Sequence, residues 1–337
     1  MRTQPLRDFS IYLKAAVRYR EGEPVYLAAP FAQVPPDLSD LPFVYPPPTL
    51  IPFAALAALP WPIAGTLWWV ALGACLIFGF RALGVSRRWS FLMLLWPPAF
   101  HGLWAGNVAA IGFLLFALGP RWGAGLVLAG LFKPQHALPA LWLVREKRSR
   151  ELVVGCGLLG ALAIASLPFI GLDRWLEWWH GLGRYQESER TIPDLAGMAL
   201  WRYLPLPLVA GLAAVLLALS LRAGGVTGLK RLGATTAVVS PSLFATGFLF
   251  ALPSLLDLRP ALFWLAIILT CVPPQGPLWW LALGLAVAGW TYRPLQRAGE
   301  RLESRSDPVD ASPRSGSRPW TTFRTVAARN TNGSLSP

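Results

Sequence analysis

The chain has 337 residues, of which 54% are hydrophobic and only 14% charged, and its formal net charge is +13. Soluble domains carry roughly 25% charged residues, so this composition excludes an ordinary soluble fold. Since a helical span needs on the order of 20 apolar residues, the chain is predicted to be an all-α, polytopic membrane protein with about 9–11 transmembrane helices.

The basic residues gather in short clusters between apolar runs, at 81–88, 145–150 and 222–231. This distribution is typical of cytoplasmic loops, so we predict no nucleic-acid partner. Residues 171–200 are rich in acids and tryptophans and are predicted to be an extracytoplasmic loop. Its tryptophans favour an amphipathic helix on the membrane over a sugar or lipid platform.

Three regions follow one another along the chain. Residues 1–48 are polar and rich in proline, and we expect an extracytoplasmic loop there, because a backbone without regular structure cannot lie in hydrocarbon. Residues 49–292 are predicted to form the transmembrane helical domain. Residues 293–337 contain eight arginines and few apolar side chains, which predicts a disordered basic tail near anionic lipid.

Within the apolar domain, a short interfacial helix is expected before Pro60-Trp61-Pro62 and a span after it. Two spans are expected in 89–118, separated near His101-Gly102. The span over 122–144 is broken at Lys133-Pro134, where proline removes a backbone hydrogen bond and the ammonium group needs an anion or water. The remaining spans are expected over 152–170, 204–221, 232–256, 261–272 and 278–290.

Motifs in the polar N-terminal region are the most informative. Residues 8–15 follow the pattern D-F-x-x-Y-x-x-A, residues 22–26 follow G-x-x-x-Y, and residues 43–47 read F-V-Y-P-P. In order and spacing they resemble the first extracytoplasmic loop of glycosyltransferase family 87. That family belongs to the GT-C superfamily of polyprenyl-phosphate-sugar-dependent membrane enzymes and includes bacterial alpha-mannosyltransferases, so the resemblance implies a GT-C-like helical bundle.

Three downstream elements strengthen the resemblance. Gly106-Asn107-Val108 looks like the family's G-Q-V-N element, with Asn107 in place of the usual glutamine. Residues 131–134 look like its L-K-P element, and Ser240-Pro241 resembles a later Ser-Pro element. The resemblance extends over roughly residues 8–290.

The resemblance implies a hexosyltransferase of the bacterial cytoplasmic membrane. It would move a sugar, with mannose expected, from a polyprenyl-phosphate donor to a lipid or glycan acceptor at the outer face, among membrane lipids. Asp8 is the candidate catalytic base, because a carboxylate at the membrane boundary can take the proton of an attacking hydroxyl. The departing phosphate needs cations, for which Lys133, Arg184 and Arg190 are the candidates. The scheme requires no metal and no cofactor.

The other candidate substrate-binding residues are Tyr12, Tyr45, Asn107, His101 and His136. The two histidines can relay protons near neutral pH, although a structural role is favoured for both. Asp8 has an alternative interpretation as a helix N-cap. The alternative interpretation of Lys133 is a side chain that reaches from the membrane to its interface with water.

Two departures from the family pattern keep other hypotheses open. The family places a transmembrane helix before its Asp-Phe motif, whereas seven residues precede Asp8 here, so we expect an upstream start codon or a truncated product. Family members also commonly carry a His and an Asp after the Ser-Pro element, and residues 242–246 contain neither. An inactive relative is therefore one alternative. The broken spans motivate another, a transporter or flippase of a lipid-linked substrate.

Overall fold

A computed structural model of the chain describes residues 4–35, 37–272 and 276–290. These residues belong to the first of two units, Met1–Tyr292, and the basic tail predicted for residues 293–337 lies outside the described residues. Every regular element in the described part is a helix, apart from an isolated bridge between Gly197 and Leu243. The all-α prediction is confirmed.

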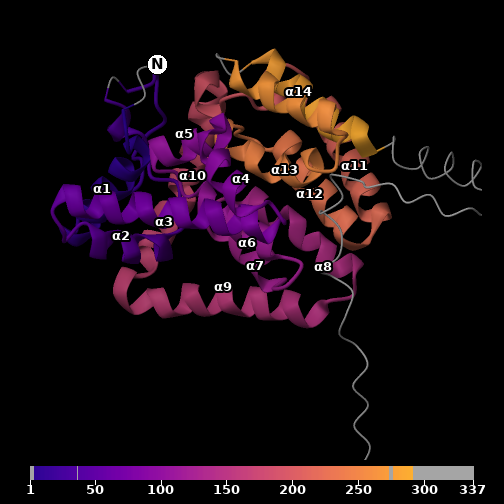
Figure 1. The fold of residues 1–337 in the computed structure, drawn as a ribbon. Coiled ribbons are helices and arrows are strands. Elements are labelled where there is room, and N and C mark those ends of the chain that lie inside the picture. The colour runs from indigo at the N-terminus through magenta and orange to yellow at the C-terminus, as the bar shows by residue number, and fades with distance from the viewer. Residues whose placement is uncertain (1–3, 36, 273–275, 291–337) are drawn as a thin grey trace, which may run out of the picture. The chain divides into compact units, whose positions relative to one another are not determined.

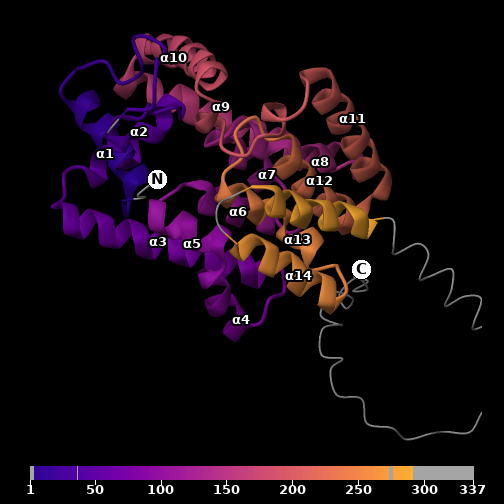
Figure 2. The same ribbon diagram turned by 90° about the horizontal axis from the view of Figure 1, so that it is seen from above.

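The α-helices follow one another along the chain as shown in Figure 1. They are α1 (Arg7–Arg20), α2 (Leu50–Leu56), α3 (Trp61–Ala82), α4 (Arg87–Leu92), α5 (Pro97–Ala105), α6 (Ala109–Leu118), α7 (Ala124–Leu128), α8 (Leu141–Arg145), α9 (Ser149–Ile170), α10 (Leu172–Thr191), α11 (Leu206–Ala223), α12 (Gly225–Val239), α13 (Leu252–Leu255) and α14 (Pro260–Cys271). A further helix, Pro277–Trp290, runs beside α14 in Figure 2.

Short 3-10 helices join or extend several of these elements. They are η1 (Leu38–Asp40), η2 (Pro47–Thr49), η3 (Met93–Leu95), η4 (Ala129–Leu131), η5 (Pro134–Ala140), η6 (Pro193–Ala196), η7 (Leu200–Arg202) and η8 (Ala245–Ala251). Because η3, η4, η5 and η8 continue or precede α-helices within apolar regions, several of the predicted spans are built from short consecutive pieces.

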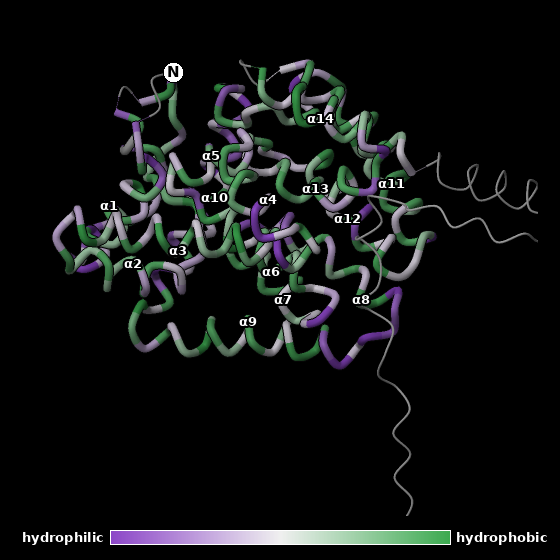
Figure 3. Tube along the Cα trace, in the orientation of Figure 1, coloured by the Kyte–Doolittle hydropathy of each residue, from purple (hydrophilic) through white to green (hydrophobic). Residues whose placement is uncertain are grey.

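Three helices, α3, α9 and α11, are long and apolar enough to cross a bilayer. Only 17% of the most apolar stretch of α9 and 11% of that of α11 are buried within the protein, against 39% in α3. In Figure 3, α9 is mostly hydrophobic and the connection from α8 to α9 is hydrophilic. Exposed apolar faces of this kind suit contact with lipid. The number of crossings stays a prediction.

The helix breaks follow glycine and proline. The predicted breaks at Pro60–Pro62 and at Lys133-Pro134 are present, the first between α2 and α3 and the second between η4 and η5. The break predicted near His101-Gly102 lies a few residues later, because α5 continues through both residues to Ala105. It ends where Gly106 adopts the left-handed conformation, φ +73°, which glycine accepts without steric cost.

The apolar face of α1 packs against α3. Phe9, Tyr12 and Ala16 are buried at helical spacing, and the Phe9 ring stacks on that of Trp68 with centroids 5.4 Å apart. The Tyr12 ring lies 4.8 Å from that of Phe53, on α2. This burial of aromatic surface fixes the start of α1, and therefore the polar residues there, against the helical domain.

Helix α10 organises the irregular chain between α1 and α2. The Glu177 Oε1 atom accepts hydrogen bonds from the backbone N–H groups of Val25 and Tyr26, at 2.7 and 2.8 Å. Farther along α10, the Ser188 hydroxyl accepts one from the N–H of Phe31 at 2.7 Å. The predicted loop 171–200 is thus largely helical, and its side chains satisfy backbone groups that have no partner of their own in a helix or sheet.

Candidate functional site

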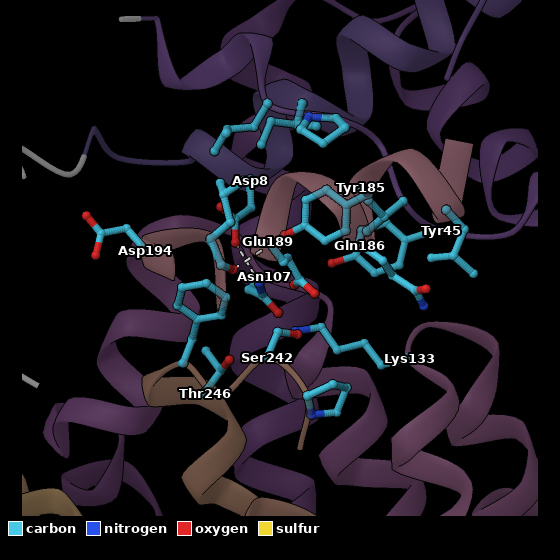
Figure 4. A pocket seen from close by; sticks show the side chains of 18 of the residues that line it. Asp8, Tyr45, Asn107, Lys133, Tyr185, Gln186, Glu189, Asp194, Ser242 and Thr246 are labelled. Atoms are coloured by element: carbon cyan, nitrogen blue, oxygen red, sulfur yellow. Dashed lines mark hydrogen bonds between the residues drawn. The ribbon is translucent and has the colours of Figure 1, made fainter. Parts of the chain in front are cut away.

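A cavity of about 650 Å³ lies among the start of α1, the junction of α5 with α6, the break at Lys133, the end of α10 and the turn after α12. Its volume is in the range of sites for small ligands. Figure 4 shows Asp8, Asn107, Lys133, Tyr185 and Glu189 around it. The sequence-predicted site residues that line the cavity are Asp8, Tyr12, Tyr45, His101, Asn107, Lys133 and Arg190.

Asp8 is buried in the first turn of α1 and its carboxylate is held on both oxygens. Oδ1 accepts hydrogen bonds from Nε and Nη2 of Arg7, at 2.8 and 2.6 Å, and Oδ2 accepts one from Nδ2 of Asn107 at 2.6 Å. No side chain caps α1, whose N-cap residue is Leu6, so the interpretation of Asp8 as an N-cap is wrong. The carboxylate is held in one orientation on the cavity wall.

Asn107 connects Asp8 to the start of α6. Its Oδ1 atom accepts a hydrogen bond from the Ala109 N–H at 2.8 Å, which leaves the amide NH₂ directed at Asp8. Gly106 has φ +73°, and a Cβ atom there would lie 3.0 Å from the Cβ of Phe9. Gly106 therefore allows α1 to approach closely, and Asn107 supplies the donor that orients the Asp8 carboxylate.

Tyr12 and Tyr45 form an aromatic wall behind Asp8. Their hydroxyl oxygens are 3.2 Å apart, and the Tyr26 hydroxyl donates to the Tyr45 carbonyl oxygen at 3.0 Å. Burial, with a smaller contribution from the Asp8 charge, raises the pKa of Tyr45, and burial likewise raises that of Tyr12. Both phenols therefore stay neutral near physiological pH and act as hydrogen-bonding groups rather than bases.

Lys133 lies between η4 and η5, where the backbone is extended with φ −144°. Its Nζ atom is 5.9 Å from the centre of the Phe244 ring and interacts electrostatically with Asp8 and Glu189. Within the described ranges Lys133 forms no ion pair. An ammonium group in this position suits an anion that enters the cavity.

Glu189 is a site residue that sequence reasoning missed. It is buried near the end of α10, one turn after Tyr185, and both side chains line the cavity. Burial raises the pKa of Glu189 to about 7, while the Lys133 charge and a hydrogen bond from Tyr185 act in the opposite direction. The available signal was the spacing of Leu182, Tyr185 and Glu189, which share one face of a helix.

The turn after α12, residues 240–246, forms the wall opposite α1 and includes the predicted Ser-Pro element. It is held against the chain that follows α10. The Met198 N–H donates to the Leu243 carbonyl oxygen at 2.7 Å, and the Leu243 N–H donates to the Ala196 carbonyl oxygen at 3.0 Å. Gly197 has φ +63°, and any Cβ there would clash with the Leu243 carbonyl. Glycine is therefore required at this bridge.

Of the remaining predicted site residues, His101 lines the cavity, and His136 and Arg184 do not. His101 lines the cavity from α5, and its buried Nδ1 has no hydrogen-bond partner among the described residues. His136 is buried away from the cavity lining, with its ring 4.3 Å from that of Phe250. Arg184, on α10, is also not among the lining residues. The structure thus brings His101 to Asp8 and leaves His136 in the core.

These features define a helical membrane protein with a charged cavity bounded by its N-terminal segment. The model of glycosyltransferase family 87 matches residues 43–253. The chain belongs to this family and is a membrane glycosyltransferase. The matched region includes Tyr45, Asn107, Lys133 and Glu189, and it begins after Asp8. No curated protein and no solved structure matches the chain.

Proposed function

We propose that the protein transfers a hexose, with mannose as the expected sugar, from a polyprenyl-phosphate donor to a lipid or glycan acceptor. The reaction takes place at the outer face of the bacterial cytoplasmic membrane. The observation that carries this proposal is the placement on one cavity of a buried carboxylate, Asp8, and of Lys133, which forms no ion pair with any other described residue.

In this reaction an acceptor hydroxyl oxygen attacks the anomeric carbon of the donor. The bond between that carbon and the phosphate oxygen breaks, and polyprenyl phosphate leaves with the bonding electrons. Asp8 takes the proton of the attacking hydroxyl. The hydrogen bonds from Arg7 and Asn107 hold this carboxylate in position before the substrate arrives.

Negative charge accumulates on the leaving phosphate, and Lys133 stabilises it at close range. Arg190 lines the same cavity from α10 and is exposed, so it supplements Lys133 at the mouth. Tyr12 and Tyr45 offer neutral hydroxyl groups for the sugar, and His101 lines the same cavity. Arg184 and His136 have no direct role in this scheme.

The test is turnover of labelled donor by the purified full-length protein in detergent. We expect label from polyprenyl-phosphate mannose to appear in a lipid or glycan of a membrane extract, and not when polyprenyl-phosphate glucose replaces it. Movement of intact donor across sealed vesicles, with no transfer in detergent, would instead support the transporter hypothesis. The absence of both activities, in protein that remains folded, would favour the inactive relative.

Replacement of Asn107 by alanine removes the donor that orients Asp8. We expect kcat for transfer to fall by about 10- to 100-fold, since a hydrogen bond to a charged group contributes roughly 1.5–3 kcal/mol. The matched control is Asn107→Gln, which restores the family's usual residue and keeps an amide donor, so it should retain more activity than the alanine variant. Equal rates for wild type and Asn107→Ala would show that Asp8 does not depend on this bond.

A further inference from the structure

We propose that Glu189 compensates charge in the cavity: it faces Lys133 as a carboxylate when the cavity is empty, and it takes up a proton when an anionic phosphate binds Lys133. This inference rests on the proposed function, in which Lys133 receives the donor phosphate. It adds a second ionisable carboxylate, with a role distinct from that of Asp8.

The two carboxylates, Asp8 and Glu189, differ in their partners. Asp8 has a permanent counter-charge, because Arg7 bonds it through Nε and Nη2. Glu189 is buried with 8% of its surface exposed and forms no ion pair within the described residues. Besides burial, the groups that act on its carboxylate are the charge of Lys133 and the hydroxyl of Tyr185, and all three side chains line the cavity. Lys133 is therefore the main cation that holds Glu189 in its ionised form.

The other charged groups around the cavity do not replace Lys133 in this role. Asp194, on η6, pairs with Arg202 at 3.2 Å. Arg190 follows Glu189 on α10 and is exposed, so solvent screens its charge. His101, on α5, interacts with Asp8 and Arg7. The remaining charged groups on the cavity wall are Arg7, Lys133, Asp8 and Glu189, whose charges sum to zero when all are ionised.

An entering phosphodiester adds one negative charge to this balanced set. It neutralises the field of Lys133, which had stabilised the Glu189 carboxylate, and it repels that carboxylate directly. Both effects favour the protonated acid. Because the pKa of Glu189 is already about 7 in the empty cavity, the additional rise falls within the physiological pH range. The proton comes from solvent, and no covalent bond of the ligand changes.

The expected consequence is that phosphodiester binding weakens as the pH rises. If the ligand raises the pKa of Glu189 by about one unit, affinity falls by about tenfold between pH 6 and pH 9, and roughly half a proton is taken up per ligand near pH 7.5. The neutral variant Glu189→Gln mimics the protonated acid. It is expected to bind about tenfold more tightly than wild type at pH 9, a gain that structural damage would not produce.

The probe is methyl farnesyl phosphate, a phosphodiester that carries one charge throughout this pH range. Its binding to the full-length protein in detergent is measured by isothermal titration calorimetry at pH 6, 7.5 and 9, in buffers of different ionisation enthalpy that report proton uptake. Glu187→Gln is the matched control, because Glu187 is exposed on the same helix, and it should behave as wild type.

The variants distinguish failure of this inference from failure of the proposed function. Wild-type proton uptake and pH dependence that persist unchanged in Glu189→Gln would overturn the role of Glu189. If Lys133→Met loses affinity at every pH in that case, the phosphate site of the proposed function still stands. If Lys133→Met binds the probe as tightly as wild type, the phosphate site itself is wrong.

Discussion

Replacement of Asp8 by asparagine is expected to lower kcat for sugar transfer by about 10²–10⁴-fold, the usual contribution of a general base. Asparagine has nearly the volume of aspartate and still accepts a hydrogen bond from Asn107, so α1 should keep its place. It cannot take the proton of the acceptor hydroxyl. The measurement is the single-turnover rate of label transfer at saturating donor, which separates chemistry from binding.

A surface acid in the same N-terminal segment provides the control for Asp8. Asp40 is exposed and pairs with Lys14, and Asp40→Asn should transfer sugar at the wild-type rate. Calorimetric binding of methyl farnesyl phosphate to Asp8→Asn shows whether the cavity remains intact. A variant that binds the probe and still turns over at the wild-type rate would exclude Asp8 as the base.

Replacement of Lys133 by methionine is expected to lower kcat/KM for the donor by about 10²–10³-fold. Methionine has a similar length and preserves the packing against Phe244, while the charge that faces the phosphate is lost. The loss affects both donor binding and the departing phosphate, so KM should rise and kcat should fall together. Steady-state kinetics with labelled donor give both constants.

Arginine at the same position separates charge from geometry. Lys133→Arg keeps the positive charge but has a longer, planar head group, so partial recovery of kcat/KM is expected. Lys14→Met, at the exposed pair with Asp40, controls for the removal of one positive charge from the protein. If Lys133→Met and Lys14→Met are equally active, Lys133 has no role in phosphate binding.

Local patterns in the sequence correctly predicted three of the four longest helices in the described part of the chain. The apolar runs of α3, α9 and α11 each reach the length of a span, and their hydropathy does not depend on what they pack against. The breaks at Pro60–Pro62 and Lys133-Pro134 were also predictable, because proline disrupts a helix regardless of its neighbours. Gly106 carried the signal for the end of α5, and the prediction placed that break a few residues too early.

Relations between distant residues were beyond the reach of a single sequence. The bond from Asn107 to Asp8 joins positions 99 apart in the chain, and no local pattern indicates it. Glu177 and Glu189 look alike on the same helix, yet one binds the backbone of the N-terminal segment and the other lines the cavity with Lys133. Only the packing of α10 decides which of the two acids lines the cavity.

The contacts of the N-terminal segment also determine when it can fold. Leu6 bonds to the backbone of Trp104, and Phe31 bonds to the side chain of Ser188. This segment therefore depends on partners that are synthesised much later, and it cannot adopt its native structure until Ser188 has left the ribosome. We therefore expect the cavity to form late in the maturation of the protein.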